Sequence, residues 1–230
     1  MNAHPLDNPI WESLASRHRA LALRHGDVAR YPAPVAPFLG VAKAGIDAAA
    51  ALEALVAPED SVFLLGPTPA VAEGWQLRHL AMLAQMACTQ PLAEPDGPGI
   101  TELGEAHRAD VLALTALVYP HYFRPRTMAL GRYFGIYLPD GAGDTRLAAI
   151  IGERMGTDDW QEISAVCTHP DFNGRGYARH LLAWLSNDVL ARGRTPFLHV
   201  SHDNARAKQL YQQAGYHFRP DIAFWSLRRG

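Results

Sequence analysis

The sequence predicts a mixed α/β protein of 230 residues. Short apolar runs typical of strands alternate with segments whose apolar residues recur at helical spacing. Two glycines, Gly174 and Gly176, stand between one such run and a helical pattern that begins directly after them. A segment rich in proline and glycine, residues 91–99, separates the first part of the chain from the rest. These observations favour two α/β parts, the second with a strand–turn–helix motif.

The first part, residues 1–95, is expected to form an N-terminal α/β domain. The apolar element at residues 75–88 fits either a strand or a helix. The other predicted elements are a helix over 14–24, an extended proline-rich segment over 29–42, a helix over 48–57 and a strand over 61–65.

Clearer patterns follow from residue 100 to residue 230. Leu181, Leu182, Leu185 and Val189 form a one-sided stripe after the glycines, and Asn204 can cap a later helix. The predicted strands cover 100–103, 133–138, 146–153, 162–168, 195–202 and two segments within 217–227, and the predicted helices cover 106–118, the residues after the glycines, and 205–214.

Composition narrows the class of protein. Apolar residues make up 48% of the chain and charged residues 19%, so we expect a globular protein rather than a disordered one. Because the formal net charge is only −2, we expect neither nucleic acid nor membrane as a partner. No basic start precedes an apolar block, and no stretch reaches the roughly 20 apolar residues that span a bilayer. We therefore expect a cytoplasmic protein, for which homodimer formation stays open.

Cysteine and histidine positions argue against a metal site. Cys88 and Cys167 lie far apart and form no metal-binding pair, so we also expect no disulfide framework. His199 and His202 lie three positions apart on a predicted strand and therefore face opposite sides. We interpret both as core or surface histidines.

The turn NGRGYA, residues 173–178, suits a bound anion. A helix N-terminus presents unpaired backbone N–H groups, and glycines beside it let a phosphate come close. Arg175 and Arg179 add positive charge. The alternative is a tight chain reversal that needs glycine only for its backbone. The chain has no Walker loop, and the third glycine of a dinucleotide fingerprint is missing.

Two ordered runs, EISAVCTHPDFNGRGYARHLL and PFLHVSHDNARAKQLYQQAGY, resemble the acetyl-coenzyme-A-binding core of the GNAT N-acetyltransferase family, in particular a bacterial branch with this second run. The resemblance covers residues 100–230. It implies a mixed, mostly antiparallel sheet flanked by helices, with residues 1–95 as an additional domain or a degenerate GNAT-like half. It also implies acetyl-CoA as cosubstrate without a metal, and direct transfer of acetyl to a primary amine in a ternary complex. The amine would belong to a small molecule, an amino acid or a peptide.

The resemblance also implies catalytic residues. Glu162 would act as the general base, with Glu153 as a reserve candidate. Tyr211 would protonate the departing sulfur, since a phenol stays protonated at neutral pH. Cys167 is expected to be a small buried residue rather than a nucleophile.

Residues that hold coenzyme A follow from the same resemblance. The pantetheine arm would pair with the backbone of the strand before the turn, and its pyrophosphate would lie on the turn. The family's turn begins with glutamine or arginine where this chain has Asn173, a change that leaves the backbone contacts in place. The full set is Val166, Cys167, Thr168, Asn173, Gly174, Arg175, Gly176, Tyr177, Ala178, Arg179, Asn204 and Lys208.

The acceptor and the activity each keep an alternative. In similar enzymes, segment 119–135 forms a wall of the acceptor pocket. An aromatic and basic wall suits an acceptor that carries a carboxylate. The alternative is that this segment is a solvated loop without a role in binding. Its aromatic and basic residues are Tyr119, His121, Tyr122, Phe123, Arg124 and Arg126. A catalytically inactive coenzyme-A-binding regulatory or interaction module, favoured by Asn173, stays open. So does an acyltransferase for longer or aryl acyl groups.

Overall fold

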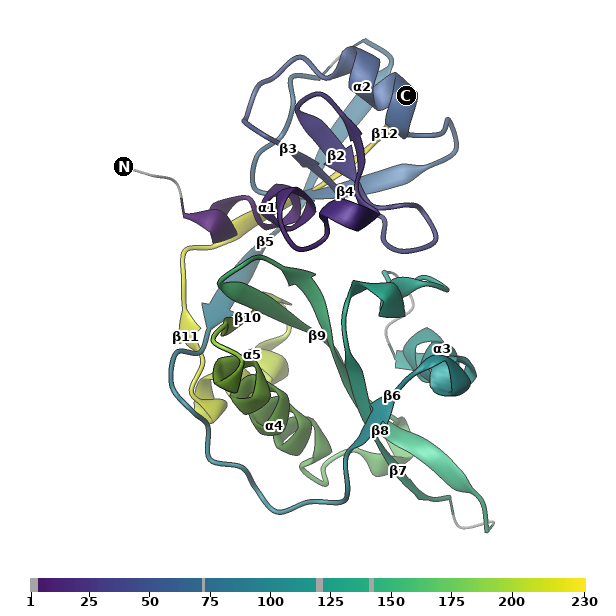
Figure 1. Cartoon of the computed structure of the whole chain (residues 1–230), viewed down its shortest axis with the longest axis vertical. Helices are drawn as coiled ribbons and strands as arrows, with labels where there is room; N and C mark the ends of the chain where they lie inside the picture. The colour runs from purple at the N-terminus through teal and green to yellow at the C-terminus, as the bar shows by residue number, and fades with distance from the viewer. Residues whose placement is uncertain (1–3, 72, 119–121, 141–142) are drawn as a thin grey trace.

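The structure is a computed structural model that describes residues 4–71, 73–118, 122–140 and 143–230. Figure 1 shows two lobes joined by long strands. None of the described helices is long and apolar enough to cross a membrane. The helices are α1 (Pro9–Ala15), α2 (Ala49–Leu55), α3 (Arg108–Val118), α4 (Tyr177–Ala191) and α5 (Ala205–Ala214), with 3-10 turns at Pro5–Asp7, Arg19–Leu21, Glu105–His107, Thr127–Leu130 and Pro170–Phe172.

Twelve strands are present in the described residues, nine of them in one large sheet. The large sheet has the order β4-β12-β5-β10-β9-β8-β7-β6 with β11 beside β5, and β1–β3 form a small sheet. Only β10 and β9 pair in parallel among the described neighbours of the large sheet, which confirms the predicted mixed α/β fold with a mostly antiparallel sheet. The strands are β1 (Leu23–His25), β2 (Val28–Arg30), β3 (Leu39–Val41), β4 (Ser61–Leu65), β5 (Trp75–Ala87), β6 (Thr101–Leu103), β7 (Tyr133–Pro139), β8 (Thr145–Gly156), β9 (Trp160–Thr168), β10 (Thr195–Ser201), β11 (His217–Phe218) and β12 (Ile222–Arg229).

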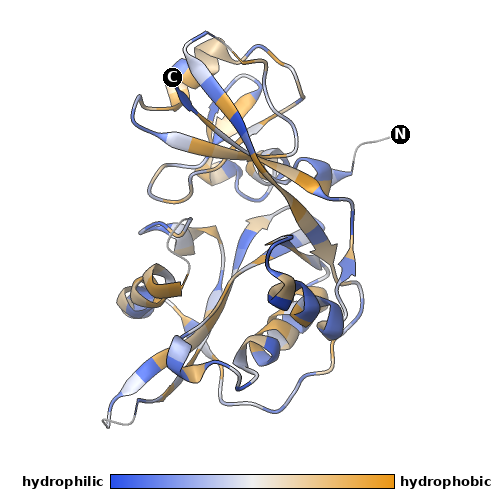
Figure 2. Cartoon of the chain, turned by 180° about the vertical axis from the view of Figure 1, so that it is seen from behind, coloured by the Kyte–Doolittle hydropathy of each residue, from blue (hydrophilic) through white to orange (hydrophobic). Residues whose placement is uncertain are grey.

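Strands β5 and β12 connect the lobes. β12 pairs with both β4 and β5, and the end of β5 pairs with β10. Strands from the first hundred residues therefore extend the sheet of the second part. Figure 2 shows hydrophobic residues along the strands that cross the middle of the molecule. Side chains from distant parts of the sequence meet at this crossing.

Helix α4 packs on the sheet through its predicted apolar stripe. Burial of each large apolar side chain contributes about 1.5–3 kcal/mol, and the fully buried members of the stripe are Leu181, Leu182, Leu185 and Val189. An ion-pair network adds a second attachment, because Arg132 Nη2 lies 2.5 Å from both Glu153 Oε1 and Asp188 Oδ2. These contacts fix α4, and with it the turn at its start, against the sheet.

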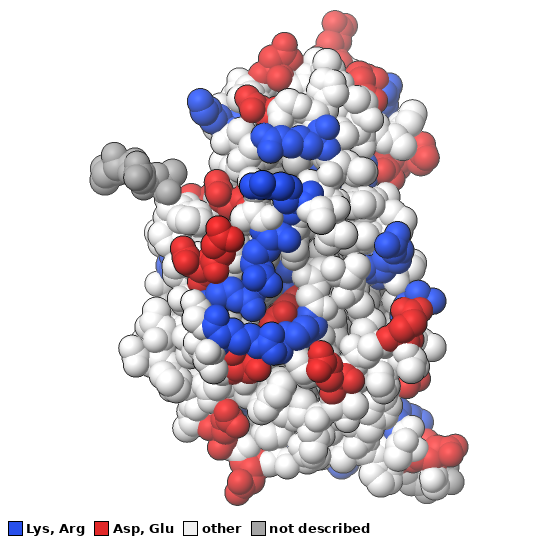
Figure 3. All heavy atoms as spheres, in the orientation of Figure 1, with Lys and Arg blue, Asp and Glu red and all other residues white. Residues whose placement is uncertain are grey.

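Basic side chains gather near the middle of the face shown in Figure 3, with acidic side chains beside them. The buried Arg194 has a polar partner, because its Nη1 donates to Gln161 Oε1 at 2.5 Å. Burial and the charge of Arg17 lower the pKa of Arg194. Charges of both signs thus lie close together in a chain of formal net charge −2.

The predicted helix over residues 14–24 is wrong. Helix α1 ends at Ala15, and the backbone N–H of His18 donates to Ser13 O at 2.9 Å. The Nδ1 atom of His18 lies 3.1 Å from Ser13 Oγ and 2.8 Å from the Tyr31 hydroxyl. These contacts outweigh the local helical pattern, and the chain continues into β1. The strand predicted over 61–65 is confirmed, and the element at 75–88 is the strand β5.

Candidate functional site

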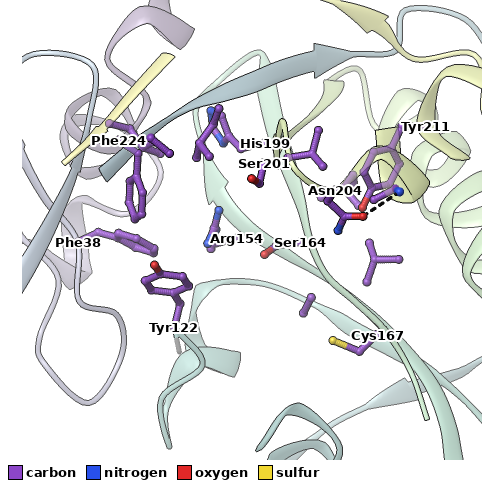
Figure 4. A pocket seen from close by; sticks show the side chains of 18 of the residues that line it. Phe38, Tyr122, Arg154, Ser164, Cys167, His199, Ser201, Asn204, Tyr211 and Phe224 are labelled. Carbon is purple, nitrogen blue, oxygen red and sulfur yellow. Dashed lines mark hydrogen bonds between the residues drawn. The ribbon is translucent and has the colours of Figure 1, made fainter. Parts of the chain in front are cut away.

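Two parallel strands separate at the centre of the large sheet. Residues Thr195–Phe197 of β10 pair with Trp160–Glu162 of β9, and their pairing ends there. Beyond this point both strands line a hollow of about 560 Å³, here called the inner cavity (Figure 4). Figure 4 shows Phe38, Tyr122 and Phe224 at one end of the inner cavity and Asn204 and Tyr211 at the other. The full lining is residues 163–167 of β9 and 199–201 of β10, with Phe38, Leu65, Leu80, Ala81, Leu83, Tyr122, Arg154, Asn204, Ala207, Tyr211 and Phe224.

A bulge in β9 shapes this cavity. Ala165 has a φ of 52°, and the pairing register between β8 and β9 shifts around it. Such a left-handed conformation costs a residue with a Cβ roughly 1–2 kcal/mol. Between the pairs Ile150–Cys167 and Gly152–Ser164, β9 has one residue more than β8, at the edge of β9 that lines the cavity. The bulge therefore brings extra backbone of β9 to the cavity wall.

A second hollow of about 690 Å³, here called the glycine-turn cleft, lies at the start of α4. Gly174 and Gly176 have φ values of +78° and +81°, and a Cβ on either would meet no atom within 4 Å. Gly176 is the N-cap of α4 and provides no side-chain hydrogen bond. The glycines are thus required by backbone conformation and not by packing. They leave the first N–H groups of α4 accessible to an anion.

The inner cavity and the glycine-turn cleft adjoin. Val166, Asn204, Ala207 and Tyr211 line both hollows. Asn204 Oδ1 accepts a hydrogen bond from the backbone N–H of Ala207 at 3.0 Å, which confirms the predicted cap of α5. Figure 4 shows Asn204 and Tyr211 side by side at this junction. An elongated ligand could therefore reach from the glycine turn past Tyr211 into the inner cavity.

Most of the predicted coenzyme-binding residues come together here. The glycine-turn cleft is lined by Val166, Thr168 and all residues of 173–179, while Cys167 lines the inner cavity. Lys208 differs: its Nζ lies 3.5 Å from His202 Nδ1, and it is not among the lining residues of either hollow. Arg206, two positions after the cap Asn204, lines the glycine-turn cleft, whereas Lys208 does not.

Glu162 is fully buried and is not among the residues that line the inner cavity. Arg154 donates to both of its oxygens, from Nε to Oε2 at 2.6 Å and from Nη2 to Oε1 at 2.7 Å. His199 Nδ1 lies 2.7 Å from Oε1. Burial by itself would raise the pKa of Glu162, but Arg154 and His199 lower it to about 2. A carboxylate stabilised in this way is a weak proton acceptor.

His199 is held at both ring nitrogens. Gln85 Nε2 lies 3.0 Å from His199 Nε2 and also donates to the backbone oxygen of Leu6 at 2.9 Å. Because the amide donates, His199 Nε2 accepts, and His199 Nδ1–H is left to donate to Glu162. The reserve candidate Glu153 is also buried, pairs with Arg132 and lines neither hollow.

Cys167 is buried, as expected, and burial raises the pKa of its thiol to about 12. A thiol with such a pKa stays protonated at neutral pH and is a poor nucleophile. Among the residues that the structure describes, no group of three or more His, Cys, Asp or Glu side chains could hold a metal ion.

Aromatic rings surround one end of the inner cavity. The aromatic end, defined as Phe38, Tyr122 and Phe224, has Tyr122 at its centre, with ring centroids 6.4 Å from Phe38 and 5.8 Å from Phe224. Phe63 supports it from behind, 5.5 Å from Phe224. The Arg154 guanidinium lies 5.0 Å from the centre of the Phe38 ring. Figure 4 shows Arg154 between these rings and the wall of β9.

The structure describes only part of the predicted acceptor wall. Tyr119 and His121 of segment 119–135 lie outside the described residues. Tyr122 lines the inner cavity, whereas Arg124 lines a separate surface hollow with Glu59 and Asp60.

The sequence patterns did not indicate several residues that line the inner cavity. Arg154 carried a usable signal, because a charged residue inside the apolar β8 lies eight positions before Glu162, across the hairpin from it. Phe38 and Phe224 carried none, since no local pattern indicates that residues so far apart in the sequence will meet.

Two comparisons of the sequence with known proteins find similar proteins. The family of FR47-like proteins matches residues 139–226. An acetyltransferase of Yersinia enterocolitica is 37% identical over 78 residues, which are 32% of this chain and 55% of that protein. The match thus spans about half the length of this curated relative.

Solved structures extend the similarity to the whole chain. A crystal structure from Novosphingobium aromaticivorans DSM 12444, assigned to an acetyltransferase from the GNAT family, is 33% identical over 99% of this chain and 100% of that chain, with a TM-score of 0.87. A GCN5-related N-acetyltransferase from Kribbella flavida is 18% identical over 96% of this chain and 95% of that chain. Its TM-score of 0.60 shows a shared fold.

Proposed function

The chain belongs to the GNAT family, and on this premise we propose that it transfers an acetyl group from acetyl-CoA to a primary amine. One observation carries the proposal: a cleft at a glycine-opened helix and a cavity between two separated strands meet at Tyr211. The first suits a pyrophosphate, and the second suits a thioester and its acceptor.

Coenzyme A would follow this path. Its pyrophosphate would accept hydrogen bonds from the first N–H groups of α4, near Arg175 and Arg179. Its pantetheine arm would enter between β9 and β10 and pair with backbone around Val166, where the bulge exposes additional peptide groups. The N-terminal part, residues 1–95, would complete the acceptor side, because Phe38 and β5 line the inner cavity.

The transfer would proceed by direct attack in a ternary complex. The amine nitrogen forms a bond to the thioester carbonyl carbon, and the carbon–sulfur bond then breaks. Tyr211 gives its hydroxyl proton to the departing sulfur and regains one from solvent, while the amine releases a proton to water. The products are an N-acetylated amine and free coenzyme A. The buried thiol of Cys167 takes no part in this sequence.

We assign Glu162 a positioning role rather than the base role that the resemblance implies. It holds Arg154 and His199 in place through hydrogen bonds of 2.6–2.7 Å. The acceptor would therefore enter as the free amine. The acid limb of the pH profile of kcat/KM should then follow the basicity of each acceptor. A limb at one fixed pH for acceptors of different basicity would instead indicate a protein base.

A coenzyme-A-binding module without catalysis is the second candidate. The observation in its favour is that the described residues lining the inner cavity include no aspartate or glutamate. Such a module binds acetyl-CoA and acetylates no amine.

Calorimetric titration with acetyl-CoA, 3′-dephospho-CoA and ADP tests the proposal first. We expect binding that requires the pantetheine arm, so that ADP binds far more weakly than acetyl-CoA. Coenzyme A release on addition of amines then separates the enzyme from the inactive module. Absence of acetyl-CoA binding by folded protein would exclude both candidates.

A further inference from the structure

The inner cavity has one end whose chemistry points to a class of acceptor. Resting on the proposed function, we propose that the acceptor is an aromatic amine that is uncharged at neutral pH, selected by the aromatic end of the inner cavity. Three observations support this, namely the arrangement of the rings, the charge around Arg154 and the way in which Glu162 already occupies that arginine.

The rings of the aromatic end form an apolar site for a planar group. Phe38 and Tyr122 lie nearly parallel at 26°, while Phe224 stands edge-on to Tyr122 at 78°. Leu65 and Leu83 complete the lining on the side of β4 and β5. Aromatic rings prefer such stacked and edge-to-face partners, which add to the free energy of burying their surface.

The charge near the rings disfavours an ammonium group. Arg154 is the one Lys or Arg among the described residues that line the inner cavity, and no aspartate or glutamate accompanies it there. An alkylammonium would lose part of its hydration in the inner cavity and gain no carboxylate contact from the lining in exchange. Aromatic faces can attract a cation, and the ring of Phe38 already has one in Arg154. A neutral aromatic amine carries no charge, so it neither loses the hydration of an ion nor needs a carboxylate partner.

The same arginine is poorly placed to recognise an acceptor carboxylate. Arg154 Nε and Nη2 donate to the two oxygens of Glu162, which offsets the charge of the guanidinium. An acceptor carboxylate would meet a guanidinium whose charge a buried carboxylate already offsets, so it would gain little from the contact. The structure therefore favours an aromatic amine over the carboxylate-bearing acceptor suggested by segment 119–135.

Four amines separate these classes in a coenzyme A release assay at neutral pH. Aniline is aromatic and uncharged, benzylamine is aromatic and cationic, cyclohexylamine is a non-aromatic cation of similar size, and phenylalanine carries a carboxylate. We expect kcat/KM for aniline to exceed each of the others by about tenfold or more. Equal or higher values for any of the other three would overturn the proposal.

Matched variants test whether the rings are the cause. Phe224→Leu should raise KM for aniline about tenfold and leave KM for acetyl-CoA unchanged. Phe63→Leu is the control, since Phe63 packs against the same rings without lining the inner cavity. Equal effects of the two variants on the KM for aniline would contradict a direct contact.

Failure of this inference differs from failure of the proposed function. If acetyl-CoA binds and cyclohexylamine or phenylalanine is the better acceptor, the activity stands and the acceptor class is wrong. If acetyl-CoA binds and none of the four amines is acetylated, the acceptor class is again wrong, and turnover of other amines then separates an enzyme with another acceptor from the inactive module. If acetyl-CoA does not bind, both proposals fall.

Discussion

The two ends of the candidate site are built in different ways. The glycine-turn cleft is lined by residues 173–179 and by residues of α5, α3 and β9, and its main feature is the backbone of one continuous segment, residues 173–179, at the start of α4. The aromatic end comes from side chains on separate parts of the chain: Phe38 before β3, Tyr122 after α3, and Phe224 in β12.

This difference has a physical consequence. Backbone N–H groups at a helix start are set by local conformation and can bind the same anion in many proteins. Side chains that meet only after folding can change one at a time without affecting the cleft. The first end therefore suits a constant ligand, and the second suits a particular acceptor.

The largest expected effect tests the glycine-turn cleft. Gly176→Ala should weaken acetyl-CoA binding by about a thousandfold, because the new Cβ points into the open space where a phosphate would accept several charge-assisted hydrogen bonds. Calorimetric titration measures this. Gly193→Ala is a matched control with a φ of +76° and open space around its Cβ, and it lines neither hollow. Comparable loss of binding in both variants would mean that strain alone is responsible.

A second effect concerns the ion pair behind the aromatic end. Glu162→Gln should lower the free energy of unfolding by about 3 kcal/mol, because Arg154 would keep its charge without a carboxylate. Urea denaturation measures the loss. Glu153→Gln, which breaks the buried pair with Arg132, should lose less stability, because Asp188 still pairs with Arg132, and should leave the acceptor KM unchanged. If both variants changed the acceptor KM equally, Glu162 would have no special position.

Tyr211 lies where the two ends meet, and its expected effect is on turnover. Tyr211→Phe should lower kcat by about a hundredfold with little change in the KM for acetyl-CoA, because a proton donor acts only as the sulfur departs. Tyr216→Phe is the control: its buried hydroxyl lies 2.7 Å from Ser186 Oγ, away from both hollows. An unchanged kcat in Tyr211→Phe would remove the proposed acid.

The smallest expected effect is a decrease in the free energy of unfolding in acid, which depends on His18 in the N-terminal part. Burial lowers the pKa of His18 from 6.5 to about 4, so below pH 6.5 the unfolded chain binds a proton that the folded chain does not. Stability should fall by about 2 kcal/mol between pH 7 and pH 5. Denaturation at both pH values measures this, and His18→Gln should flatten the dependence. The same loss in the variant would assign it to other groups.

Much of the second half of the fold follows from local patterns. The helix α5 begins after the Asn204 cap and ends at Gly215, which has a φ of 109°, as the sequence predicts. The strand predicted over 162–168 forms the greater part of β9. Such elements are predictable because caps, glycines and apolar spacing act within a few residues of one another.

Predictions fail where distant contacts decide. The segment after Ala15 leaves the helix because His18 bonds to Tyr31. The base role that the resemblance implies for Glu162 stays a prediction, but distant contacts set its surroundings too, because the hairpin turns Arg154 onto it and β10 brings His199 against it. Burial and pairing, rather than residue type, decide what such a carboxylate can do.

The sequence by itself determined the backbone of the glycine turn at the start of α4. A strand, two glycines and an amphipathic helix in immediate succession specify a helix N-terminus open to an anion, because the interactions that form it are local. Only the tertiary structure decided the aromatic end of the inner cavity. Phe38, Arg154 and Phe224 come together because β12 and β5 extend the sheet of the second part, and contacts of such sequence separation leave no periodic pattern in the chain.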